Sequence, residues 1–257
     1  MNKKFRKDIN GLRAIAVLIV AIFHICAFNS FSNHKLTLSL DAGYVGVDIF
    51  FVISGFLMTS IICNGLSANS FSTWTFWKNR AKRICPALFV AVALFYVIGF
   101  FLLVNIDEFH EYCKEAPLAL AFVSNIRFAQ HDGYFAVNSM SKILLHTWSL
   151  SVEWQFYVIY PLLLVLLHKF KNPIILKGTV VVIFLISLVL SILLIDEKNY
   201  FLLHTRAWEL LCGALVFLYP IKALQAKSTK IKSIIEIMAI LLLLSIFLRS
   251  NVSVWSA

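Results

Sequence analysis

The chain has 257 residues, of which 60% are apolar and only 14% are charged. Soluble domains are about 45–50% apolar and about 25% charged, so this chain has too little polar sequence to cover a soluble enzyme. The composition also excludes a disordered chain, a coiled coil, a collagen-like chain and a small disulfide scaffold. We therefore predict an all-α protein, a bundle of helices that cross a membrane.

The net charge of +10 has two interpretations. In a soluble protein such an excess suggests a nucleic-acid partner, whereas membrane proteins collect Lys and Arg in their cytoplasmic loops. The apolar composition favours the second interpretation, and we expect no nucleic-acid partner. The five cysteines form no CxxC pattern and mostly lie in or beside apolar runs, so they predict neither a disulfide framework nor a zinc site.

A helix that crosses a bilayer needs about 20 mostly apolar residues. Seven segments qualify, some marginally. In chain order they are residues 12–31, 43–63, 84–104, 143–167, 179–195, 201–219 and 234–248. The shorter apolar segment 116–129 predicts a re-entrant or interfacial helix, because a full span there would invert every later loop. No repeat or linker interrupts the chain, and we predict a single domain over residues 1–257.

The distribution of Lys and Arg predicts the orientation of these spans. Fifteen of them fall at the N-terminus, before the third span, after the fourth and after the sixth, whereas the alternate loops hold five. Basic loops stay in the cytoplasm, so we expect a cytoplasmic N-terminus.

Two ionisable residues, Arg13 and His24, lie inside the first predicted span. Such a side chain costs about 2.5–3.5 kcal/mol at the bilayer centre, so it needs a partner or a function. Their separation is close to three helical turns, which places both on one face about 16 Å apart. Arg13 is either a snorkelling side chain or part of a site. His24 is either a packing residue or a general base that titrates near neutral pH.

Arg80 and Arg83 stand three residues apart in the basic segment before the third span. If that segment is helical, the two guanidinium groups share a face and suit a phosphate or diphosphate. The alternative is an ordinary cytoplasmic loop. Pro86 follows closely, where we expect the first turn of the third helix.

The fourth span opens with the polar run HTWSLSVEWQFY, residues 146–157. His146, Ser149 and Glu153 share one helix face in that run. A carboxylate in an apolar, membrane-spanning segment is energetically costly, so Glu153 is a candidate functional residue.

Further acidic residues occur in the second and sixth spans. Arg206 and Glu209 have the spacing of an intrahelical ion pair, which is either structural or part of a site. Asp48 lies near the start of the second span, where the helix dipole favours an anion. The sequence has no P-loop, GxSxG, HExxH or GxGxxG motif, and no spacing typical of a zinc site, so we expect no metal.

Four blocks in this order carry a family resemblance. They are DINGLRAIAV (8–17) with His24 behind it, GYVGVDIFFVISGFL (43–57), FWKNRAKRICP (76–86), and LHTWSLSVEWQFY (145–157) with TRAWELLCG (205–213) behind it. Together they resemble the acyltransferase-3 family, bacterial membrane proteins that O-acylate surface carbohydrates.

The resemblance implies an acyl-CoA donor, usually acetyl-CoA, whose phosphates are held by Arg13, Arg80 and Arg83 at the cytoplasmic face. It implies that His24 activates the acceptor hydroxyl or relays the acyl group, and that Glu153 orients or charge-balances His24. The remaining candidates either bind substrate or form a structural ion pair; they are Asp48, His146, Ser149, Arg206 and Glu209. Arg206 is expected to pair with Glu153 or with substrate.

The implied acceptor is a sugar hydroxyl at the external face of the bacterial inner membrane, as in lipopolysaccharide O-antigen, peptidoglycan, exopolysaccharide or a lipid-linked precursor. Family members usually have more spans than the seven expected here. The chain is therefore expected to be a naturally short member, an incomplete gene product or a fragment. A truncated inactive relative and a transporter are the alternatives to an active enzyme. The sequence does not give the oligomeric state.

Overall fold

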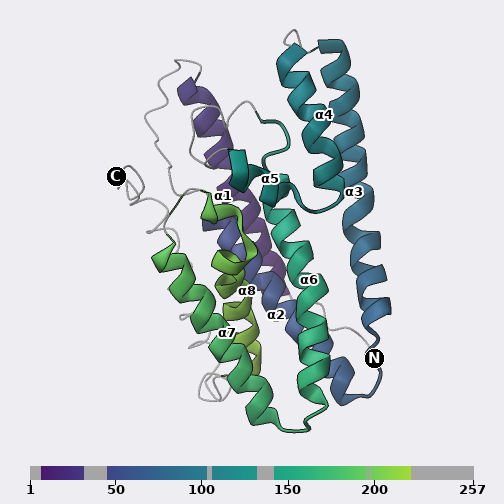
Figure 1. Ribbon diagram of the computed structural model, residues 1–257, viewed down its shortest axis with the longest axis vertical. Helices are drawn as coiled ribbons and strands as arrows, with labels where there is room; N and C mark the ends of the chain where they lie inside the picture. Colours follow the sequence, from purple (N-terminus) through teal and green to yellow (C-terminus); the bar gives the residue numbers. More distant parts are fainter. Residues whose placement is uncertain are drawn as a thin grey trace. The chain divides into compact units, whose positions relative to one another are not determined.

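The computed structural model describes residues 7–31, 45–102, 106–131, 142–194, 196 and 198–220. Every regular element within these ranges is a helix, as the composition predicted. In chain order the helices are α1 (Lys7–Phe31), α2 (Val45–Ser67), α3 (Thr73–Leu102), α4 (Ile106–Leu120), α5 (Ser124–His131), α6 (Thr147–His168), α7 (Pro173–Leu193), the 3₁₀ helix η3 (Asn199–Phe201) and α8 (Leu203–Leu218) (Figure 1).

Five of the described helices are long and apolar enough to cross a membrane: α1, α2, α3, α6 and α7. The expected count of seven is not confirmed. The sixth expected span, residues 201–219, forms the end of η3 and then α8, which has only 16 residues. The seventh, residues 234–248, lies outside the described residues.

Helix α3 begins 11 residues before the predicted span 84–104, so the expected loop is wrong. The hydroxyl of Ser72 accepts a hydrogen bond from the Thr75 N–H at 3.3 Å, which caps the early start. Arg80 and Arg83 are consequently helical residues. Pro86 lies inside the helix and not in its first turn.

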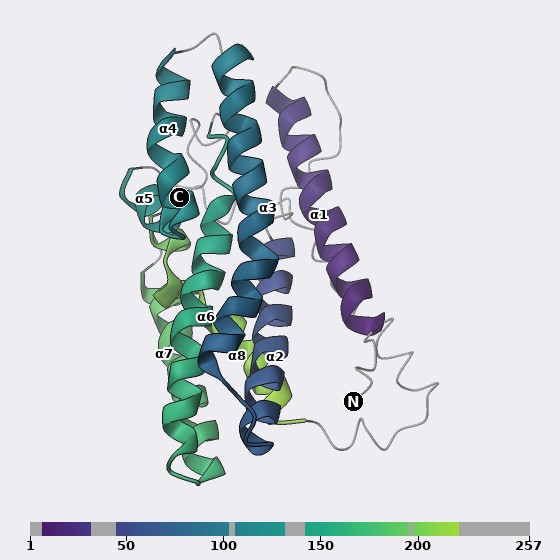
Figure 2. The same cartoon turned by 90° about the vertical axis from the view of Figure 1, so that its right-hand side faces the viewer.

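The apolar segment 116–129 is not one helix. It is divided between α4 and α5, and the chain turns at Phe122, whose φ of 57° is rare for a bulky residue. Contacts from α6 hold this turn: Gln155 Nε2 donates to the Phe122 carbonyl oxygen at 3.0 Å, and the Trp154 ring stacks on Phe122 with centroids 4.6 Å apart. Helix α4 lies beside α3 (Figure 1 and Figure 2), and Tyr112 donates a hydrogen bond to the Val92 carbonyl oxygen.

Contacts group the chain into two compact units, Met1–Ile53 with Tyr219–Ala257, and Ser54–Leu218. In the first unit α1 packs closely on the start of α2 at Gly46. A Cβ atom there would lie 2.8 Å from the Ala16 carbonyl oxygen and 2.5 Å from Val20, so only glycine permits this approach.

The second unit contains a still closer approach, between α2 and α8. A Cβ atom on Gly55 would lie 1.7 Å from the Leu210 carbonyl oxygen. Real Cβ atoms essentially never come within 3.0 Å of such an atom. This contact brings the backbone of α2 directly against α8, next to the site described below.

Candidate active site

The carboxylate of Glu153 is the centre of a polar cluster in the second unit. Its Oε1 atom accepts hydrogen bonds from the Ser54 hydroxyl of α2 and from the Tyr157 hydroxyl of α6. Ser54 and Tyr157 are buried, and Glu153 is half-buried. Two hydroxyl donors therefore compensate part of the cost of burying a carboxylate, and they fix the direction in which it points.

Arg80 belongs to the surroundings of this cluster through two aromatic residues. Its guanidinium carbon lies 5.8 Å from the centroid of the Phe76 ring, in the range of a cation–π contact. The Phe76 ring in turn meets the Tyr157 ring edge-on, with centroids 6.3 Å apart. A chain of contacts thus runs from Arg80 on α3 to Glu153 on α6.

A hydrogen bond between α3 and α6 fixes this arrangement. Trp77 Nε1 donates to the Tyr157 carbonyl oxygen at 3.0 Å. Because Trp77 neighbours Phe76, the first turns of α3 are held in register with the middle of α6. Arg80 is half-buried there, while Arg83, one turn further along α3, is exposed. The helical spacing that the sequence offered as one alternative is therefore present.

His146 and Ser149 lie on α6 with Glu153 but make different contacts. His146 is exposed at the N-cap position, and Ser149 Oγ donates to the His146 carbonyl oxygen at 3.3 Å. The hydrogen bonds that orient Glu153 come instead from Ser54 and Tyr157. The face shared by His146, Ser149 and Glu153 therefore does not by itself define the surroundings of the carboxylate.

The spacing of Arg206 and Glu209 produces an ion pair, with Arg206 Nη1 2.8 Å from Glu209 Oε1. Their side chains are only 11% and 1% exposed. The Arg206 guanidinium also lies over the rings of Tyr200, at 4.6 Å, and Trp148, at 5.7 Å. Arg206 thus has Glu209 as a carboxylate partner, which is the ion pair that the spacing predicted.

The first unit holds His24, Arg13 and Asp48. His24 is half-buried, and its Nδ1 atom lies 2.7 Å from the Val20 carbonyl oxygen. A carbonyl oxygen can only accept, so Nδ1 carries the hydrogen and the lone pair of the neutral ring lies on Nε2. Val20 also contacts Gly46, so the close packing of α1 on α2 supports the turn that orients His24.

Arg13 and Asp48 are both half-buried in this unit. Arg13 lies on α1, one helical turn from Ala16, which packs at Gly46. Asp48 lies in the first turn of α2, where the helix dipole favours its negative charge, as the sequence indicated.

Sequence reasoning missed Ser54, Tyr157 and Trp77 as parts of the site. Tyr157 had a usable signal, since it follows Glu153 by four residues on the same helix face. Ser54 carries no specific signal, because a small residue in an apolar helix also suits close helix packing. Nothing in the local sequence indicated that Trp77 reaches the backbone of α6, because that contact joins residues 80 positions apart.

Comparisons with known proteins identify the family of the chain. A family model described as "Acyltransferase domain" matches residues 6–256. The chain belongs to the acyltransferase-3 family. It is 37% identical over 216 residues to an uncharacterized protein of Haemophilus influenzae, a match that covers 80% of this chain and 88% of that protein. No solved structure matches the chain.

Two relatives carry functional names. A peptidoglycan O-acetyltransferase OatA of Listeria monocytogenes is 34% identical over 232 residues, which cover 87% of this chain and 35% of that protein. An O-acetyltransferase OatA of Staphylococcus aureus is 34% identical over 236 residues, which cover 88% and 37%. The chain thus spans about a third of the length of these two relatives.

Proposed function

We propose that this protein is a membrane-bound O-acyltransferase that moves an acyl group, most simply acetyl, from acyl-CoA to a hydroxyl of a cell-envelope carbohydrate. The observation that carries the proposal is the Glu153 carboxylate, oriented by Ser54 and Tyr157 within a chain of the acyltransferase-3 family. The names of the OatA relatives support acetyl as the group and peptidoglycan as one acceptor to test, beside O-antigen sugars.

The donor's phosphates need cationic partners, and Arg80 and Arg83 fit that need. They share one face of α3. Arg83 is exposed and can bind an anion at the protein surface, whereas Arg80 is half-buried beside Phe76 and can bind an anion deeper in the protein. Arg13 is the third expected contact. Bound acyl-CoA supplies an activated thioester. In the proposed orientation these arginines lie at the cytoplasmic side of the bacterial inner membrane, with the N-terminus in the cytoplasm.

The proposed step uses His24 as general base. Nε2 accepts the proton of the acceptor hydroxyl while the oxygen attacks the thioester carbonyl carbon. The new C–O bond forms, the C–S bond breaks, and the proton passes to the departing thiolate. The Nδ1 hydrogen bond to the Val20 carbonyl holds the ring in the tautomer that this step requires. Glu153 is the second residue proposed for catalysis. Its negative charge balances the positive charge that His24 gains when it accepts the proton.

The test is transfer from labelled acetyl-CoA to peptidoglycan or O-antigen fragments by the full chain purified in detergent. His24→Ala should reduce transfer by about 10²–10⁴-fold, the usual contribution of a general base. His204→Ala is the matched control, because His204 is exposed and has no proposed role. Full activity of His24→Ala would overturn the base assignment. Donor binding without turnover by the wild-type chain would indicate an inactive relative, and solute flux in liposomes without donor binding would indicate a transporter.

A further inference from the structure

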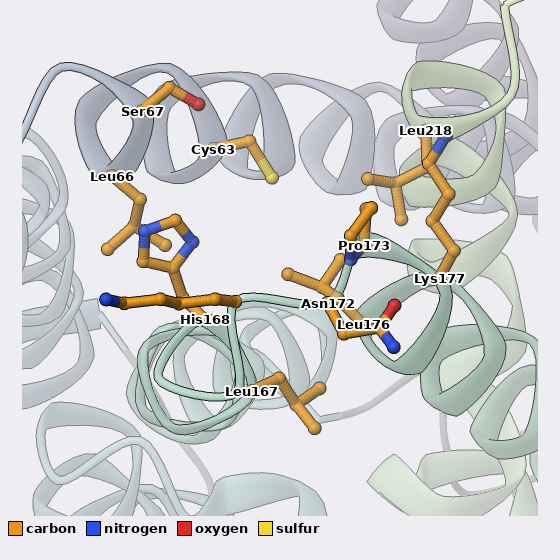
Figure 3. Close-up of a pocket in the computed structure, with 11 residues that line it drawn as sticks. Cys63, Leu66, Ser67, Leu167, His168, Asn172, Pro173, Leu176, Lys177 and Leu218 are labelled. Atoms are coloured by element: carbon orange, nitrogen blue, oxygen red, sulfur yellow. The ribbon is translucent and has the colours of Figure 1, made fainter.

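A pocket of about 370 Å³ lies within the second unit, away from the Glu153 cluster. Figure 3 shows side chains from the last turns of α2 and α6 and the first turns of α7 around it, with the Cys63 thiol pointing into the space between these helices. Leu218, the last residue of α8, completes one side. The volume falls at the small end of the range of about 300–1,000 Å³ that is typical of ligand sites.

The pocket lies at one end of the helices that line it. Helix α2 ends at Ser67 and α6 at His168, and α7 begins at Pro173. These three helices are among those long and apolar enough to span a membrane, so their common end marks a boundary between hydrocarbon and water. Phospholipid phosphates lie at that level of a bilayer.

The chemistry of the lining divides into an apolar wall and basic groups. Leu66, Leu167, Leu176 and other apolar side chains form the wall. His168, Lys171 and Lys177 supply the basic part, Ser67 and Asn172 add neutral polar groups, and none of the described residues that line the pocket is acidic. Lys171 is exposed and Lys177 half-buried, so the positive charge extends from the rim into the pocket.

We propose that this pocket binds a phosphate group on an amphiphilic molecule, and that its source is the headgroup of an anionic phospholipid. Basic pockets between membrane-spanning helices recognise such headgroups by charge, while adjacent apolar side chains contact the start of the acyl chains. The ligand is distinct from the acyl donor of the proposed reaction, so this inference stands apart from the proposed function. A soluble phosphate compound has the same recognition chemistry and is separated by the experiment.

The experiment measures lipid binding to the full chain, purified in an uncharged detergent, by native mass spectrometry. Phosphatidylglycerol and phosphatidylcholine with identical acyl chains are titrated in parallel. We expect the wild-type chain to retain phosphatidylglycerol preferentially. Lys171→Gln with Lys177→Gln should weaken that binding by about 25-fold, since each lysine near a lipid phosphate contributes about fivefold.

The matched control is Lys78→Gln with Lys169→Gln, which removes the same charge from exposed lysines that do not line the pocket. The control should bind phosphatidylglycerol like the wild type, and equal melting temperatures of both double variants show that each is folded. Displacement of the lipid by millimolar inorganic phosphate from the wild type and from the control, but not from the Lys171→Gln/Lys177→Gln variant, would assign the pocket to a soluble phosphate source and overturn the lipid assignment. Equal binding of both lipids, or equal losses in the two double variants, would overturn the proposal.

Discussion

The substitution Gly55→Ala tests the closest helix contact in the second unit. The added methyl group would lie 1.7 Å from the Leu210 carbonyl oxygen, whereas real Cβ atoms essentially never approach within 3.0 Å. The two backbones must therefore separate by at least 1.3 Å, the difference between these distances. Neither atom belongs to a flexible side chain, so local rearrangement cannot absorb the clash.

The cost should lie at the upper end of the range for overpacked sites, about 3 kcal/mol. For a chain of this size that corresponds to a melting temperature lower by about 6–12 °C. The measurement is a thermal melt of the purified protein in detergent. Because Ser54 precedes Gly55, displacement of α2 should also weaken the hydrogen bond to Glu153 and reduce acetyl transfer.

Gly178→Ala is the matched control. Gly178 lies inside α7, and a Cβ atom there would meet nothing within 4 Å. Replacing a glycine inside a helix by alanine should stabilise the protein by about 0.5–1 kcal/mol, so this variant should melt at or above the wild-type temperature. A melt of Gly55→Ala within one or two degrees of the control, about what 0.5 kcal/mol produces, would refute the close approach of α2 and α8.

Three other substitutions test separate parts of the structure. Tyr157→Phe keeps the ring but removes one donor to Glu153, so acetyl transfer should fall and its pH profile shift while the melt stays close to wild type; an unchanged profile would contradict the positioning role. Arg206→Ala leaves the Glu209 carboxylate buried without this partner and should cost about 3–5 kcal/mol in a denaturation assay, of which a second change, Glu209→Gln, should recover a part. The pKa of Glu111 is lowered by the hydrogen bond from Lys114 and by the charge of Arg127, so its stabilising contribution is present above the ordinary pKa of 4.5 and is lost as the pH falls through the lowered value. Half-exposure keeps this contribution small, and Glu111→Gln should show a weaker loss of melting temperature on acidification than the wild type.

The sequence predicted the helical class and most of the spans because the signal is local. A run of apolar residues must bury its backbone polar groups inside a helix, whatever packs around it. The same logic failed at the start of α3. Its first turns carry charged residues and therefore resemble a loop, yet the Ser72 cap and contacts of Phe76 and Trp77 with α6 make them helical. Tertiary contacts decided that boundary.

The site shows the same division between local and distant information. Glu153 was identifiable because a carboxylate in an apolar helix needs a reason, and the Arg206–Glu209 pair because its partners are three residues apart. The partners of Glu153 were not all identifiable, since Ser54 lies 99 residues away. Likewise, the apolar content of residues 116–129 did not reveal the break at Phe122, which Gln155 stabilises from another helix.

The dipeptide Ser54-Gly55 explains why the second sequence block matters to the site. Successive residues of a helix point about 100° apart, so the two positions face different neighbours. Ser54 donates to Glu153 on α6, while Gly55 admits the Leu210 backbone of α8. The direction of the carboxylate therefore depends on how closely α2 and α8 approach. Ser54→Ala should lower acetyl transfer with little loss of stability, whereas Gly55→Ala should lower both. If instead both variants lower stability equally, Ser54 acts mainly in packing, and its orientation of Glu153 does not contribute to the chemistry.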